Sequence, residues 1–182
     1  MEQIVIPDKT FTLYKEGTRT FIHILRDESN ADLKSRLTFR QEVLLVNKDT
    51  KEEFMQLFWF VFDVKECDRF FILAFCWDKE APLFFNRKQK ARLLARDTGN
   101  TISHSADYLS HVQKYALSML NALSFLFFVN ANRGFVGDII YFYKENQRTS
   151  EQYLITDVIR LKTINGEMFE IMSLFPISFY HT

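Results

Sequence analysis

Three side chains in the middle of the chain have the types and the spacing that could hold a metal ion. His104, Asp107 and His111 are three and four residues apart, so a helix would carry all three on one face. Imidazole together with carboxylate suits zinc or iron, and such a site would make the protein a metal-dependent enzyme. The alternative is a solvated polar face, which we prefer because a catalytic metal needs a pocket that excludes water.

A basic segment before these residues has the composition of a nucleic-acid contact. It carries five positive charges within ten residues and directly follows Phe84 and Phe85. Cations mixed with aromatic rings suit phosphate backbones and stacked bases. The charges scatter around a helical wheel, however, so a solvated helix or a docking site for an acidic partner is the alternative. The candidate contacts are Arg87, Lys88, Lys90, Arg92 and Arg96.

The spacing of glycine and cysteine excludes several other chemistries. The five glycines do not form a phosphate-binding loop of either the Walker or the dinucleotide type. Cys67 and Cys76 lack the paired spacing of a zinc site and stand in no recognised nucleophile context. We therefore expect no cofactor, and the lack of a catalytic signature favours a non-enzymatic protein.

Charge and composition limit the partners and the compartment. The 23 basic and 23 acidic residues balance, so no global field attracts nucleic acid or an anionic membrane. Two cysteines fit a reducing compartment, and the N-terminus shows no secretory signal. The apolar run from Ala116 to Val129 has 14 residues, where a membrane span needs about 20. We expect a cytoplasmic or virion protein that binds protein partners or itself, with nucleic acid as a further partner through residues 87–96 and no membrane contact.

The longest periodic pattern predicts a helix from Ser103 to Asn130. Apolar residues recur there at spacings of three and four, and the second half is apolar almost all round. This helix would separate two β-rich blocks. We predict a single domain over residues 1–182, with an N-terminal β block (1–85), a helical segment (86–130) and a C-terminal β block (131–182).

Two long runs of aromatic and branched residues predict a hairpin. Phe54 to Val64 and Arg69 to Trp77 are both strand-like, and the first alternates apolar residues on both of its faces. Such a ribbon must be covered on both sides, either by the chain itself or by another subunit. The residues that we expect at an interface are Phe58, Phe60, Phe62, Phe125 and Phe128.

Short runs complete the expected β blocks. Ile4 to Ile6, Phe11 to Tyr14 and Thr20 to Leu25 predict a small meander. Near the C-terminus, the turn signal Asn165-Gly166 predicts a hairpin, and Pro176 would interrupt its second strand. No internal repeat is visible. The predicted fold is α+β: an antiparallel, aromatic-rich sheet or partial barrel packed on one long central helix, with a C-terminal three-strand unit.

The C-terminal block carries one resemblance, over residues 134–175. Gly137-Asp138 leads into the strand-like run that ends at Tyr141, and the run from Tyr153 to Val158 would pair back with it. This pattern resembles the opening strands of small β-barrels in connector and adaptor proteins of tailed-phage virions. It is also similar to barrels of the RNA-binding type associated with pseudouridine synthases. The resemblance transfers no site residue.

These features favour a non-enzymatic structural or interaction protein that is a subunit of a larger assembly such as a phage virion. The two-sided apolar hairpin and the apolar end of the predicted helix both call for a partner surface. An RNA-binding or RNA-cleaving module of the small-barrel type is the alternative, and a metal-dependent enzyme is the second alternative.

Overall fold

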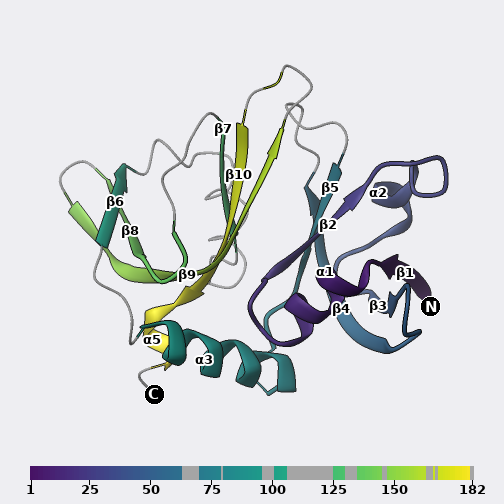
Figure 1. Ribbon diagram of the computed structural model, residues 1–182, viewed down its shortest axis with the longest axis horizontal. Coiled ribbons are helices and arrows are strands. Elements are labelled where there is room, and N and C mark those ends of the chain that lie inside the picture. The colour runs from purple at the N-terminus through teal and green to yellow at the C-terminus, as the bar shows by residue number, and fades with distance from the viewer. Residues whose placement is uncertain are drawn as a thin grey trace.

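The computed structural model describes residues 1–62, 70–78, 80–95, 101–105, 125–129, 135–144, 147–162, 166 and 168–180. Two five-stranded sheets stand beside each other, with a helix beneath them (Figure 1). The combination of sheets and helices confirms the predicted α+β class. The helices are α1 (Asp8–Lys15), α2 (Leu33–Arg36), α3 (Pro82–Ala95) and α5 (Ile177–Tyr180).

The two sheets have the same strand order. The first is arranged β1-β3-β4-β5-β2 and the second β6-β8-β9-β10-β7, so the third, fourth and fifth strands of each set lie between the first two. In both sheets the first and third strands are parallel and the other neighbours are antiparallel. The strands are β1 (Glu2–Ile6), β2 (Phe21–Leu25), β3 (Glu42–Asn47), β4 (Glu53–Phe62), β5 (Phe70–Phe75), β6 (Thr101–Ser105), β7 (Phe125–Val129), β8 (Ile139–Lys144), β9 (Gln147–Lys162) and β10 (Met168–Pro176).

This shared order means that the chain builds the same five-stranded unit twice. No matching repeat is visible in the sequence, and the equivalent strands β4 and β9 differ in length, at 10 and 16 residues. The duplication is a finding of the structure.

The predicted β4–β5 hairpin is confirmed, and the chain covers both of its faces. Phe71, Leu73 and Phe75 point into a core that α1 closes with Phe11 and Tyr14. The alternate residues of β5 face the second sheet, in a core cluster of Phe21, Trp59, Ile72, Ala74, Ile140, Tyr153, Ile155, Ile171, Met172 and Leu174. A sheet with two apolar faces needs a covering layer on each face. Here α1 covers one face, and the second five-stranded sheet covers the other.

The two sheets are also joined by polar contacts just before β2. Arg19 Nε lies 2.7 Å from Asp157 Oδ2, and both side chains are largely buried. The Thr156 hydroxyl donates to the Thr18 carbonyl at 2.7 Å, and the Thr20 amide donates to Ser173 Oγ at 3.1 Å. The stretch before β2 is therefore fixed to both β9 and β10 of the other sheet.

The predicted helix from Ser103 to Asn130 is wrong at both of its ends. Its first residues lie in β6 and its last in β7. The stretch between them, residues 106–124, lies outside the described residues. At the C-terminal end, a run of aromatic and branched residues has the composition of a buried strand, and periodicity alone does not separate such a strand from a buried helix. The proposed helical segment 86–130 accordingly contains two strands.

The predicted strand from Phe11 to Tyr14 is also wrong, because these residues belong to α1. Pro7 precedes the helix and Asp8 occupies its first turn, both of which favour a helix start. Thr10, Phe11 and Tyr14 are the buried residues of α1, at helical spacing.

Two other predicted elements are confirmed. The basic helix, expected from about Asn86 to Arg96, is present as α3 but begins earlier, at Pro82, a residue suited to a first helical position. The C-terminal hairpin is formed by β9 and β10, and β10 ends at Pro176. Among the helices that the structure describes, none is long and apolar enough to cross a membrane.

Candidate functional site

A pocket of about 590 Å³ lies between β1 and β2, and we call it the β1–β2 pocket. These strands are the two outermost strands of the first sheet: β1 pairs with β3 and β2 pairs with β5. No strand among the described residues pairs with the other edge of either one. The pocket is therefore bordered by two free strand edges, each with backbone groups that a further strand could use.

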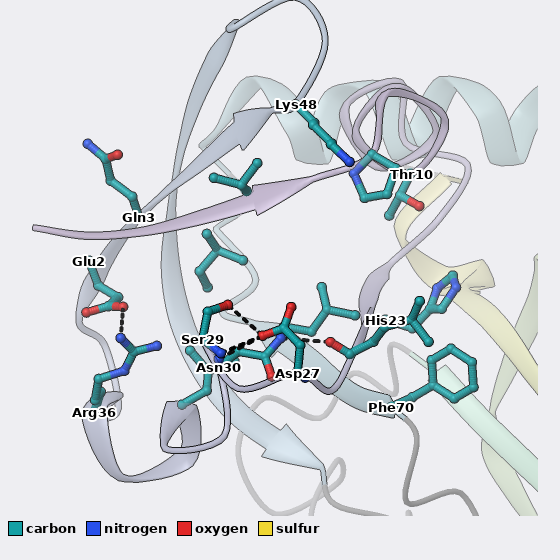
Figure 2. A pocket seen from close by; sticks show the side chains of 16 residues that line it. Glu2, Gln3, Thr10, His23, Asp27, Ser29, Asn30, Arg36, Lys48 and Phe70 are labelled. Carbon is teal, nitrogen blue, oxygen red and sulfur yellow. Dashed lines mark hydrogen bonds and ion pairs between the residues drawn. The ribbon is translucent and has the colours of Figure 1, made fainter.

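One wall of the pocket is a polar turn that follows β2. Figure 2 shows β1 on one side and Asp27, Ser29 and Asn30 on the other. The Asp27 carboxylate accepts hydrogen bonds from the amides of Ser29 and Asn30 at 2.8 and 3.0 Å. The Ser29 hydroxyl also donates to this carboxylate. This bond, and secondarily the two amide bonds, holds the pKa of Asp27 below its ordinary value. Asn30 Nδ2 donates to the Leu25 carbonyl at 2.7 Å, so the turn is tied to the end of β2.

An ion pair closes one end of the pocket. Arg36, in α2, lies 3.3 Å from the Glu2 carboxylate at the start of β1 (Figure 2). This contact connects the first strand to the short helix that follows the polar turn. The pocket therefore has an ordered rim at the end where β1 begins.

Two exposed aliphatic side chains border the pocket from its two strands. Val5 in β1 is 59% exposed and Leu25 in β2 is 63% exposed. Ile4 and Ile24, their neighbours in sequence, are buried in the core beneath. The pocket thus has a buried apolar floor and two exposed apolar side chains on its rim, which a bound apolar group would cover.

His23 is the titratable group that faces this pocket with an unmet hydrogen-bonding atom. Its Nδ1 is buried and makes no hydrogen bond in the part of the chain that the structure describes. The imidazole lies against the Phe70 ring, 5.7 Å between centroids. Burial, and secondarily the positive charge of Arg19, lowers the pKa of His23 to about 4, so the ring is neutral at pH 7.

The described part of the structure does not bring the three predicted metal ligands together. His104 lies in β6, in register with Phe142, and the expected helical spacing does not apply to a strand. Asp107 and His111 lie outside the described residues, so the metal site stays a prediction. Among the described residues, no group of three His, Cys, Asp or Glu side chains could hold a metal ion.

The predicted nucleic-acid residues divide between the surface and the interior. Lys88, Lys90 and Arg92 lie in α3, and Arg96 lies outside the described residues. Arg87 is buried, which removes its guanidinium from any phosphate backbone. A contact through this helix stays a prediction for its other basic residues.

Two of the five predicted interface residues lie inside the molecule. Phe58 is buried in the core below β4, and Phe60 packs against the cluster between the sheets. Phe62 ends β4, while Phe125 and Phe128 lie in β7, in register with Ser173 and Glu170. Nothing further is described for these three side chains. A hairpin covered by its own chain no longer calls for a partner.

The sequence did not reveal the β1–β2 pocket. A strand's place at the edge of a sheet depends on which strands pair, and pairing between β1 and β3 or between β2 and β5 is not local in the sequence. The alternation in β1 of exposed Gln3 and Val5 with buried residues was the available signal, since it is typical of a strand with one solvated face.

Comparisons with protein-family models, with curated proteins and with solved structures find no match to this chain. Its function must therefore be inferred from the geometry of its own residues.

Proposed function

We propose that the protein is a non-enzymatic interaction protein that binds an extended segment of a partner polypeptide in the β1–β2 pocket. The observation that carries this proposal is the position of the pocket between two free strand edges. Edge strands are templates for a further strand, whose main-chain groups supply binding while alternate side chains supply specificity.

The dimensions and the lining support an extended occupant. Both β1 and β2 are five residues long, so a guest strand would pair over a segment of about that length. Val5 and Leu25 would be covered by apolar side chains of the guest. His23 Nδ1 would gain a hydrogen-bond donor, because a neutral imidazole can accept through one nitrogen.

A place in a larger assembly, such as a phage virion, remains the setting that we propose for this binding. The apolar β4–β5 hairpin no longer supports it, since the second sheet covers that hairpin. The support is now the β1–β2 pocket, because recognition of a strand at a sheet edge is a common way of joining subunits.

Selection of random dodecapeptides against the immobilised protein tests this proposal. A selected peptide is labelled, and its affinity is measured by fluorescence polarisation for the wild type and for Val5→Asp and Leu25→Asp. We expect each variant to weaken binding about tenfold or more, because a carboxylate replaces an apolar contact on the rim. Phe39→Asp is the control: Phe39 is 53% exposed but lines neither pocket, and its change should leave affinity within about twofold.

Two results would overturn the proposal. One is that no peptide is selected above background, and the other is that the selected peptides bind the Val5 and Leu25 variants as well as the wild type. Light scattering after size exclusion checks for a second copy as the occupant. A wild-type dimer that Val5→Asp converts to a monomer would assign the pocket to self-association instead of to a partner peptide.

A further inference from the structure

A second pocket, of about 290 Å³, lies between β4, the segment after β5 and the start of α3. Most of its wall is apolar, with Phe54, Leu57, Leu83 and Phe84 among the lining residues. One charged side chain of α3, Arg87, also lines it, and we call this cavity the Arg87 pocket. It shares no lining residue with the β1–β2 pocket, so it raises a separate question about function.

Arg87 is a buried cation without a carboxylate partner. The residue is 3% exposed, and no carboxylate in the described part of the chain lies within 4.0 Å of its guanidinium. Its hydrogen bond to the backbone is long, from Nη2 to the Thr20 carbonyl at 3.4 Å. Its Nε is buried and donates to no acceptor among the described residues. A guanidinium has five N–H donors, so several remain available beyond this backbone bond and the hydrogen bond with the Tyr14 side chain.

Two aromatic rings hold the guanidinium in place. Its central carbon lies 5.3 Å from the centre of the Tyr14 ring and 5.0 Å from that of Trp77. Rings attract the cation through their faces but do not neutralise it. Burial raises the pKa of Tyr14 to about 12, and burial raises the pKa of the Cys76 thiol as well, so neither supplies a negative charge at pH 7.

We propose that the Arg87 pocket binds a small apolar carboxylate, with the ligand's carboxylate on the Arg87 guanidinium and its apolar body against the lining side chains. A planar carboxylate fits the forked donors of a guanidinium, and a buried cation gains most from such a partner. The pocket volume is at the lower limit for ligand sites, about 300 Å³, which suits a molecule the size of phenylacetate.

The other charged residues of the pocket favour a monoanion. Glu42 and Asp78 line it as well, and both are exposed. Their charges oppose a second negative charge on the ligand, so a phosphate dianion is disfavoured relative to a carboxylate. The carboxylate alone would meet the buried guanidinium, while the two acidic residues remain in solvent.

Isothermal titration calorimetry at pH 7 with phenylacetate, its neutral analogue phenylacetamide and inorganic phosphate tests this inference. We expect the wild type to bind phenylacetate about tenfold or more tightly than phenylacetamide, because only the carboxylate pairs with the buried cation. Phosphate should bind more weakly than phenylacetate. The comparison of these ligands on the wild-type protein does not depend on any variant folding.

Arg87→Met gives the second arm, with Lys34→Met as the control for loss of one positive charge. Lys34 is exposed in α2 and lines neither pocket. We expect Arg87→Met to abolish the preference for the carboxylate over the amide and Lys34→Met to keep it. Equal affinity of the wild type for phenylacetate and phenylacetamide, or no heat from either, would overturn the inference and would leave the β1–β2 pocket proposal untouched.

Discussion

The environment of the His23 side chain makes the stability of the folded protein depend on pH. Its Nδ1 is buried and has no hydrogen-bond partner in the described part of the chain, and its pKa falls to about 4 because burial disfavours the charged ring. The unfolded chain, with a pKa near 6.5, binds the proton more readily than the folded protein between these values. Stability from this group is therefore present above pH 6.5 and is lost as the pH falls towards 4.

Replacing His23 with Phe tests this consequence. The variant keeps a ring against Phe70 but cannot take up a proton. Relative to the wild type, we expect its free energy of unfolding to rise as the pH falls from 7 to 4, by up to about 3 kcal/mol. Urea denaturation at several pH values measures the difference. A difference that does not change with pH would show that His23 titrates normally in the folded protein.

The sequence contains His23 and Arg87 but does not indicate their environments. His23 was expected in or beside a strand, and Arg87 was expected on a solvated or nucleic-acid-binding helix face. Their burial arises from contacts with residues distant in sequence, such as Phe70 for His23 and Tyr14 for Arg87. Side-chain type predicts the chemistry that a group could do, but only the packing decides whether water reaches it.

At the scale of elements, the end of α1 shows how local geometry positions a distant helix. Gly17 has φ of +88°, and its amide donates to the Tyr14 carbonyl while the Thr18 amide donates to the Leu13 carbonyl. This is the hydrogen-bond pattern of a Schellman motif, which requires a left-handed residue after the helix. A Cβ on Gly17 would lie 2.5 Å from the Arg87 amide nitrogen, so α3 packs directly on this turn.

Gly17→Ala should therefore destabilise the protein by about 2–4 kcal/mol, because backbone strain adds to a clash with α3. Gly166→Ala is the matched control. Gly166 has φ of +79°, but nothing lies within 4 Å of an added Cβ, so its change should cost only about 1–2 kcal/mol. Thermal or urea unfolding of both variants measures the difference. Equal effects would indicate that α3 shifts away from Gly17 at little cost.

The sequence predicted elements well where one pattern stood alone. The β4–β5 hairpin came from two long runs of aromatic and branched residues, and the β9–β10 hairpin from its Asn-Gly turn signal. It failed where a residue run fitted two patterns. The stretch at β7 is apolar on all sides, so its residues satisfy a buried strand as well as a helix, and pairing with β10 decides the outcome.

At the scale of the whole molecule, two units of identical strand order share one core and a set of polar contacts. The Arg19 and Asp157 side chains, which are 6% and 15% exposed, join the two units as a buried ion pair. Removing one member of such a pair leaves an uncompensated charge, whereas replacing both members removes the desolvation cost along with the attraction.

Arg19→Met should lower the free energy of unfolding by about 3 kcal/mol, and adding Asp157→Leu should recover a large part of that loss. Lys15→Met is the control, since the Lys15–Glu52 pair is exposed and should contribute less than about 1 kcal/mol. Urea denaturation of the wild type, Arg19→Met, Asp157→Leu and the double variant gives the coupling energy. Additive losses for Arg19 and Asp157 would mean that the pair does not hold the two units together.

The duplication also places the proposed site in context. The two units present equivalent outer strands, β1 and β2 in the first and β6 and β7 in the second, although the side chains of β6 and β7 lie outside the described residues. Neither the order of the strands nor their free edges could be predicted from local patterns, since both depend on long-range pairing. The class of the fold could, because the chain carries blocks of strand signals separated from a segment with helix signals.

Hydrogen exchange of the backbone amides, measured by mass spectrometry with and without a selected peptide, tests the proposed peptide binding most directly. If an extended segment pairs with the free edges, amides in residues 2–6 and 21–25 exchange more slowly in the complex, and those in β3 and β4 change little. Protection that appears only outside β1 and β2, while the peptide is bound, would contradict the proposed strand recognition.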